Sequence, residues 1–324
     1  MSDAALLVAV LAAATARGAA PLVLAALGGL FSERSGIVDV GLEGKMLAGA
    51  FGAAATAAVT GSAWIGLGAG IAASMLVAAV HGFACVTHGG NQVVSGMALN
   101  ITMSGMTAVL AYAWFREGGQ TPLLGGAARF GPIALPGARA LADVPGVGLL
   151  YGQVVSGHNA LVYLAAAAVP LVAWLVSRTR FGLRLRAAGE NPGAVDSAGV
   201  SVSRTRYQGV LMSGALCGLS GAYLSIAHHA SFIRDMSAGK GYLALAALIF
   251  GQWRPVPTVL ACLLFAFADA VQTRLQGTAL PVVGVMPVQL IQAIPYVLTV
   301  GLLAGLVGRA VAPRAIGAPY TKER

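Results

Sequence analysis

Long stretches without a charged side chain constrain this chain more than any other feature. Of its 324 residues, 10% are charged and 57% are hydrophobic, whereas a soluble domain carries about 25% charged residues. The uncharged stretches are 46–81, 92–115, 157–177, 207–233 and 255–268. Such lengths suit helices that cross a hydrocarbon core of about 30 Å. We therefore predict an all-α, polytopic membrane protein, with residues 1–324 forming a single transmembrane domain.

Basic residues gather at two places, and such clusters are typical of cytoplasmic loops. Segment 178–206 contains six arginines, and the tail 309–324 adds more basic side chains. The connection 116–157 has few basic residues and many turn-forming ones, so we expect it outside the cell. The net charge of +9 is then a topology signal and does not indicate nucleic-acid binding.

The apolar pattern predicts nine or ten spans. The first thirty residues leave the number open, because Arg17 divides them into 4–16 and 18–31. One long span in this region gives nine spans in the whole chain, and two short spans give ten. We favour ten spans, with both termini in the cytoplasm. The turn at 253–255 then also faces the cytoplasm. The other spans are expected near 44–60, 63–86, 92–115, 158–177, 207–227, 239–252, 256–275 and 288–308.

Two segments resemble each other and run in opposite directions under this topology. Gly44-Lys-Met-Leu-Ala-Gly-Ala-Phe-Gly52 is similar to Lys240-Gly-Tyr-Leu-Ala-Leu-Ala-Ala-Leu-Ile-Phe-Gly251, and each follows a glycine-containing polar break. Inverted repeats with broken helices are typical of transporters. We predict repeats over 18–115 and 207–308, with chance similarity in a Gly- and Ala-rich sequence as the alternative.

A short helix is predicted within the arginine-rich segment. Asn191 is a good N-cap, Pro192 suits the first helical position, and Gly199 suits the residue beyond the end. A helix of about seven residues is marginal alone in water. The membrane domain, a partner protein or both must therefore hold it.

Sequence motifs for enzymatic chemistry are absent. A P-loop requires Gly-x-x-x-x-Gly-Lys-Ser/Thr to hold phosphate and magnesium, and neither Gly44-Lys45 nor Gly239-Lys240 fits that pattern. We predict no ATP site, no cofactor and no enzymatic activity in this chain. The histidines are not joined by further ligands at metal-binding spacing, so we predict no metal site.

The densest polar cluster beside an apolar span lies between residues 30 and 45. Its carboxylates could handle protons or cations, because ionisable groups within a membrane are functional candidates. We favour a structural re-entrant turn in which Glu43 pairs with Lys45 or Arg34. The predicted broken-helix motif comprises Gly36, Asp39, Gly41, Glu43 and Gly44.

Two polar stripes are candidates for the translocation pathway. Asn and Gln side chains can bind the amide, carbonyl and hydroxyl groups of a neutral solute, and interhelical hydrogen bonding is the alternative. Asp269 could instead form a cap or a pair near the membrane surface. The stripes comprise Asn91, Gln92, Ser95 and Asn100, and then Asp269 and Gln272.

Several motifs together resemble the permease subunits of ABC importers. The nearest group transports nucleosides and simple sugars and is related to ribose and branched-chain amino-acid permeases. Asp39 departs from that pattern, in which asparagine is common. The motifs are Gly28-Gly-Leu-Phe-Ser-Glu-Arg-Ser-Gly-Ile-Val-Asp-Val-Gly-Leu-Glu-Gly44, Arg186-Ala-Ala-Gly-Glu-Asn-Pro-Gly-Ala194, Ser213-Gly-Ala-Leu-Cys-Gly-Leu-Ser-Gly-Ala222 and Phe267-Ala-Asp-Ala-Val-Gln-Thr-Arg-Leu-Gln276.

The resemblance implies an importer of the bacterial inner membrane that works by alternating access. Its expected partners are an ATPase subunit that holds ATP and magnesium, a second, homologous but different permease, an extracytoplasmic solute-binding protein and membrane lipid. We expect nucleosides as solutes, with a simple sugar, a branched-chain amino acid or an ATP-independent secondary transporter as alternatives. The helix that contacts the ATPase would comprise Glu190, Asn191, Pro192, Ala194, Val195, Asp196, Ala198 and Gly199, with Ala194, Val195 and Ala198 forming its apolar contact face.

Overall fold

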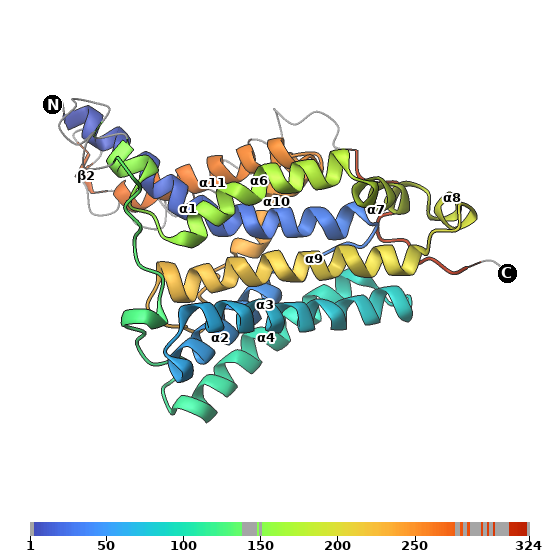
Figure 1. The fold of residues 1–324 in the computed structure, drawn as a ribbon, viewed down its shortest axis with the longest axis horizontal. Helices are drawn as coiled ribbons and strands as arrows, with labels where there is room; N and C mark the ends of the chain where they lie inside the picture. The colour runs from blue at the N-terminus through green and yellow to red at the C-terminus, as the bar shows by residue number, and fades with distance from the viewer. Residues whose placement is uncertain are drawn as a thin grey trace.

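A computed structural model describes residues 3–137, 148, 151–275, 279–280, 284–285, 293, 297, 301 and 311–322. Its long helices lie roughly along one axis (Figure 1). The α-helices of the described residues are α1 (Asp3–Arg34), α2 (Leu42–Thr60), α3 (Ala63–Gly82), α4 (Gln92–Phe115), α6 (Ala160–Arg178), α7 (Arg180–Glu190), α8 (Pro192–Ser197), α9 (Val202–Tyr223), α10 (Lys240–Phe250) and α11 (Pro255–Leu275).

Shorter elements extend or connect these helices. Single π-helical turns follow α3 (η1, Phe83–Thr87) and α9 (η4, Leu224–His228), and η3 (Tyr151–Val155) precedes α6; η2 (Gly126–Ala128) is a 3-10 turn. Strand β1 (Ala279–Leu280) pairs antiparallel with β2 (Gly284–Val285).

The predicted all-α membrane architecture is confirmed. Six helices of the described residues are long and apolar enough to cross a membrane. Local sequence explains where two of them begin: the side chain of Asn91 accepts from the first turn of α4, and that of Asn159 does the same for α6. Most of the predicted span 288–308, and Gln276 of the final motif, fall outside the described residues.

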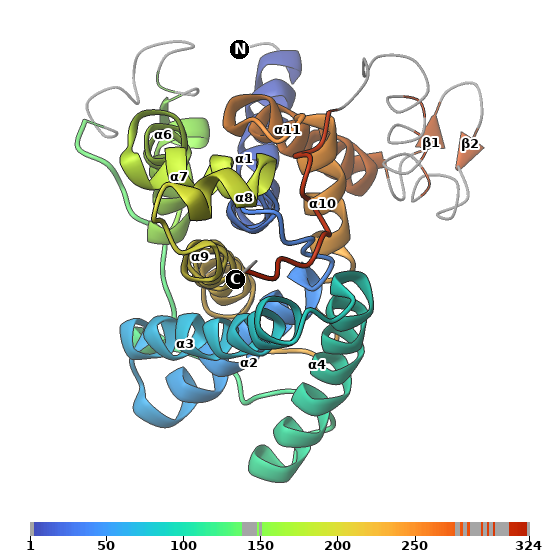
Figure 2. The same ribbon diagram turned by 90° about the vertical axis from the view of Figure 1, so that its right-hand side faces the viewer.

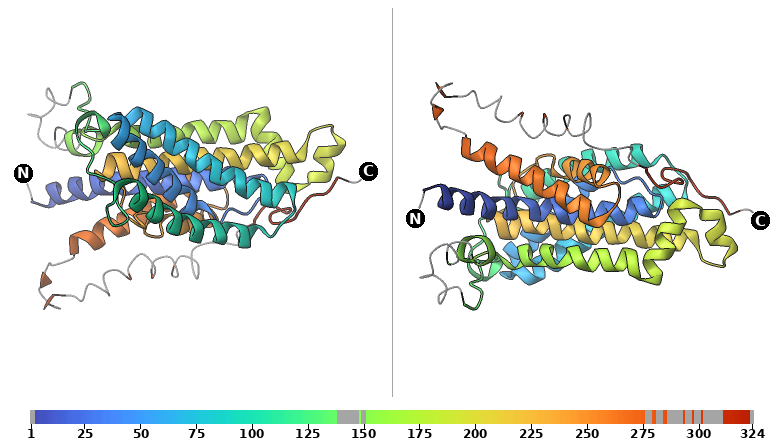
Figure 3. Two further views of the ribbon diagram at one scale, coloured as in Figure 1. Left: turned by 90° about the horizontal axis from the view of Figure 1, so that it is seen from below. Right: turned by 90° about the horizontal axis from the view of Figure 1, so that it is seen from above.

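The favoured division of the first thirty residues is wrong. Residues Asp3–Arg34 form one continuous helix, α1, in which Arg17 is an interior position. Arg17 lines a cavity between α1 and α11. The two chain ends consequently lie at opposite ends of the bundle (Figures 1 and 3), which also corrects the prediction that both termini share one side.

Helix α9 lies at the centre and packs against α1, α2 and α3 (Figure 2). Small residues make this possible. A Cβ atom at Gly221 would lie 2.1 Å from the Met46 carbonyl oxygen, and one at Gly49 would lie 2.8 Å from Cα of Gly218. Backbones that approach this closely are typical of helix packing in membranes.

The two predicted broken helices meet at their N-termini. A Cβ atom at Gly241, in the first turn of α10, would lie 2.5 Å from the Glu43 backbone nitrogen in α2. From this meeting point α2 runs toward the end of the bundle that holds Trp64 and Phe130, whose rings are 4.9 Å apart. Helix α10 runs the other way, toward Trp253, whose carbonyl accepts from Arg34. The opposite directions support the inverted repeat, which stays a prediction.

Candidate functional site

Helix α8 projects from one end of the bundle (Figures 1 and 2). It begins as the sequence predicts: the Asn191 side chain accepts from Ala194 N at 3.1 Å, and Pro192 is the first helical residue. Gly199, just past its end, has a φ of +77°, a conformation that favours glycine. Residues at both ends of α8 thus set its bounds.

The expected apolar contact face on α8 needs correction. Ala194 and Ala198 are exposed, but Val195 is buried. Val195 therefore holds α8 to the rest of the chain and cannot belong to an exposed face. Glu190 and Asn191 are exposed, and Asp196 is half-buried.

The end of α7, directly before α8, is here called the base of α8. Its backbone contacts the end of α1, directly before the loop between α1 and α2. A Cβ atom at Gly189 would lie 2.3 Å from the Arg34 carbonyl oxygen. Residues 311–322, here called the tail strap, cross the same place: Ala315 N donates to Gly189 O at 2.8 Å, and Gly317 N donates to Gly36 O at 3.0 Å. The strap also reaches α8 itself, since Lys322 pairs with Asp196 at 3.7 Å.

A fully buried ion pair joins the loop between α1 and α2 to the first turn of α2. Lys45 Nζ lies 2.6 Å from Asp39 Oδ2, both side chains have no solvent exposure, and Ser213 Oγ donates to the same carboxylate at 2.6 Å. The predicted pairing of Glu43 with Lys45 or Arg34 is therefore wrong. Asp39, the departure from the family pattern, supplies the negative charge that a buried lysine requires.

Glu43 instead binds the beginning of α10. Its carboxylate accepts from Ser237 Oγ at 2.5 Å, from Gly239 N at 2.8 Å and from Gly241 N at 2.6 Å. The first amides of a helix lack intrahelical acceptors and favour a negative charge. One glutamate thus joins the N-termini of both broken helices.

The first polar stripe surrounds this loop. Asn100 accepts from Gly44 N at 2.8 Å and donates to Val40 O at 2.9 Å, while Gln92 Oε1 accepts from Val38 N at 2.6 Å. Ser95 reaches the loop through His81, whose ring bonds both Ser95 Oγ and Val38 O. The bond to Gly44 N joins α4 to α2, whereas the bonds to Val38 and Val40 hold the loop; Asn91 caps α4. Solute contact by these residues stays a prediction.

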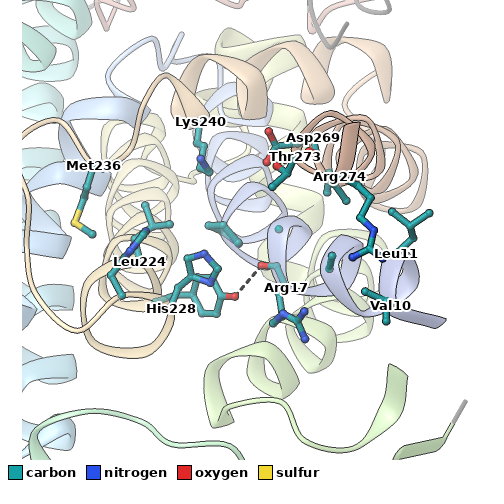
Figure 4. Close-up of a pocket in the computed structure, with 17 residues that line it drawn as sticks. Val10, Leu11, Arg17, Leu224, His228, Met236, Lys240, Asp269, Thr273 and Arg274 are labelled. Carbon is teal, nitrogen blue, oxygen red and sulfur yellow. Dashed lines mark hydrogen bonds between the residues drawn. The ribbon is translucent and has the colours of Figure 1, made fainter. Parts of the chain in front are cut away.

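Asp269 lies elsewhere, in a cavity of about 430 Å³ between α1, η4, α10 and α11 (Figure 4). We call it the α1–α11 cavity. Arg17, Lys240 and His228 join Asp269 there, and the His228 ring stacks on Tyr223 with centroids 5.8 Å apart. Gln272 is half-buried on α11 and is not among the lining residues. Sequence reasoning missed Arg17, Lys240 and His228, because each comes from a different segment.

The α1–α11 cavity combines an aromatic stack with charges of both signs. A flat, polar, uncharged molecule could stack on the rings and form hydrogen bonds at the rim. Metal binding is not indicated in the described part of the chain, where no three His, Cys, Asp or Glu side chains come together.

Broken helices that meet inside a membrane bundle, beside a cavity lined in part by charged side chains, define a membrane transport subunit. The chain belongs to the family described as branched-chain amino acid transport system / permease component, which matches residues 11–303.

Three relatives are similar along almost the whole chain. The guanosine ABC transporter permease NupQ of Bacillus subtilis is 37% identical over 94% of both chains. The nucleoside ABC transporter permease NupC of Lactococcus lactis is 35% identical, again over 94% of both. The putative glucose ABC transporter permease TsgC13 of Haloferax volcanii is 36% identical over 96% of this chain and 97% of its own length.

Proposed function

We propose that this chain is the membrane-spanning permease of an ATP-driven importer for nucleosides. The observation that carries the solute class is the α1–α11 cavity, where stacked Tyr223 and His228 rings adjoin Asp269. A nucleobase stacks on aromatic rings, and ribose hydroxyls donate to a carboxylate. Two of the relatives above are named for guanosine or nucleosides. The relative named for glucose makes a simple sugar the second candidate.

The driving force comes from partners in this proposal. An ATPase subunit, with ATP and magnesium, binds the exposed side of α8. Its movement reaches the broken helices through Gly189 and Gly36, which the tail strap joins. Gln92 and Asn100 hold the moving loop, and Glu43 makes the N-terminus of α10 move with it. The end that carries α8 faces the cytoplasm of a bacterial inner membrane.

Two further partners complete the importer. A second permease, homologous but different, forms the other half of the pore, and an extracytoplasmic binding protein delivers solute to the end opposite α8. Purification of the tagged chain in mild detergent should recover the ATPase and the second permease. Recovery of the chain alone would contradict this assembly.

Uptake by the assembled importer in proteoliposomes tests the solute class. Labelled guanosine should accumulate with ATP, and excess glucose should not compete. His228→Ala should lower guanosine uptake roughly threefold to tenfold, the range expected from one lost stacking contact. The matched control is His88→Ala, because His88 is exposed beside Phe83 and does not line the cavity. Accumulation of glucose without guanosine would favour the sugar reading.

A further inference from the structure

Two hollows adjoin on the outer surface of α9, close to the end that carries α8. The first, of about 390 Å³, lies between α7 and the beginning of α9. The second, of about 400 Å³, lies further along α9, beside α3 and α6. Phe181 and Gln208 line both hollows, so the two hollows adjoin at these side chains. We call the pair of hollows the α9 groove.

The part of the groove near α8 is polar and basic. Arg184 and Arg204 line it together with Ser201 and Thr205. None of the described residues that line it is acidic. Two guanidinium groups and a hydroxyl-rich rim form a setting that suits phosphate, because arginine donates paired hydrogen bonds to its oxygens.

The remainder of the groove is apolar. Met75, Leu175, Leu211, Met212 and Ala215 line it, from three helices that are long and apolar enough to cross a membrane. On two of these helices, α6 and α3, Leu171 is 54% exposed and Leu76 is 68% exposed. Exposed leucines on such helices fit contact with hydrocarbon. The groove therefore changes from basic to apolar along α9, as a membrane changes from headgroup to acyl chain.

We propose that the α9 groove binds an anionic phospholipid. Its phosphate lies between Arg184 and Arg204, and one acyl chain follows Leu175, Leu211 and Met212 into the apolar hollow. Charge complementarity identifies the headgroup, since basic pockets between membrane helices at the cytoplasmic surface bind anionic lipid. Because the basic hollow and the apolar hollow adjoin, a molecule that fills both must have a charged part and an apolar part.

The site also touches the segment that leads out of α8. Gly199 and Val200 line the basic hollow, and Gly199 has the left-handed conformation that ends this segment's turn. A bound lipid would therefore fix the position of α8 relative to α9. This consequence rests on the proposed role of α8; lipid binding itself does not.

Native mass spectrometry of the full chain, released from detergent, tests the site directly. Phosphatidylglycerol should stay bound in preference to phosphatidylcholine of the same chain length. Replacing both arginines (Arg184→Gln with Arg204→Gln) should weaken phosphatidylglycerol binding roughly thirtyfold, because each basic residue near an anionic headgroup contributes about a fivefold factor. The matched control is Arg178→Gln with Arg180→Gln, from the same segment but outside the groove.

Further measurements separate lipid from other occupants. Ala215→Trp fills the apolar hollow and should weaken phosphatidylglycerol binding while the chain still folds, as shown by an unchanged melting temperature. Soluble glycerol phosphate should compete poorly, since it lacks the acyl chain. Equal retention of both lipids, or unchanged binding by the double arginine variant, would overturn the proposal. So would loss of the ATPase or the second permease from that variant at unchanged lipid binding, which would make the groove a protein contact.

Discussion

The hydroxyl of Tyr223 donates a hydrogen bond of 2.8 Å to the carbonyl oxygen of Arg17 (Figure 4). Pro21 lies four residues beyond Arg17 inside α1 and has no N–H to give that carbonyl its usual intrahelical partner. Tyr223 supplies the missing donor from α9. The bond therefore lets α1 continue as one helix past a proline and joins it to α9 beside the α1–α11 cavity.

Replacing Tyr223 with phenylalanine should destabilise the protein by about 1–2 kcal/mol, because the Arg17 carbonyl is left without a donor. Thermal unfolding in detergent measures the loss. Pro21→Ala restores a backbone N–H at the right position, so Tyr223→Phe should cost much less in that background. An equal loss in both backgrounds would show that the hydroxyl does not act through this carbonyl.

The buried pair of Asp39 and Lys45 gives a second prediction. Lys45→Met leaves a carboxylate unpaired inside the bundle and should cost about 3–5 kcal/mol. Changing both residues (Asp39→Asn with Lys45→Met) removes both charges and should recover at least half of that loss, with Ser213 still able to bond residue 39. Melting temperatures of Lys45→Met, Asp39→Asn and the double variant are compared with that of the unaltered protein. A double variant as unstable as the sum of its singles would contradict the pairing.

Local features of the sequence predicted much of this fold, whereas the sequence did not predict which distant segments are in contact. The beginning of α4 and that of α8 follow from Asn91 and Asn191, whose side chains act within a few residues. The partners of Lys45 and Glu43 depend on which helices become neighbours. Nearly uniform Ala- and Gly-rich surfaces do not specify that choice, so the nearest charges in sequence were chosen wrongly.

The same reason explains the error at Arg17. A charge in an apolar run predicts a membrane boundary when the helix is considered alone. In the folded chain, Asp269 and Tyr223 come from two other helices to form the cavity that receives Arg17. A cavity built from separate segments leaves no pattern in any one of them.

A third prediction concerns α8. Ala194→Asp places a charge on an exposed position, so the chain should fold normally while uptake falls and less ATPase copurifies. Val195→Asp buries a charge at a position that is 8% exposed and should instead lower the melting temperature, because a buried unpaired carboxylate is costly. Ala194→Ser is the conservative control. Normal uptake by Ala194→Asp would argue against ATPase docking on this helix.

A fourth prediction follows from the tail strap. Deleting residues 311–324 removes the bonds from Ala315 to Gly189 and from Gly317 to Gly36, which tie the base of α8 to the loop before α2. We expect the importer to assemble and hydrolyse ATP, but to move less solute for each ATP consumed. Parallel assays of ATP hydrolysis and uptake in proteoliposomes give this ratio.

The control for the deletion is Lys322→Ala, which removes only the exposed ion pair with Asp196. An exposed pair contributes about 0–1 kcal/mol, so the ratio of solute to ATP should stay close to that of the unaltered protein. If the deletion lowers hydrolysis and uptake in proportion, the ratio of solute to ATP is unchanged and the strap serves assembly of the importer. Movement of α8 would then reach the broken helices through the direct contact of Gly189 with Arg34 alone.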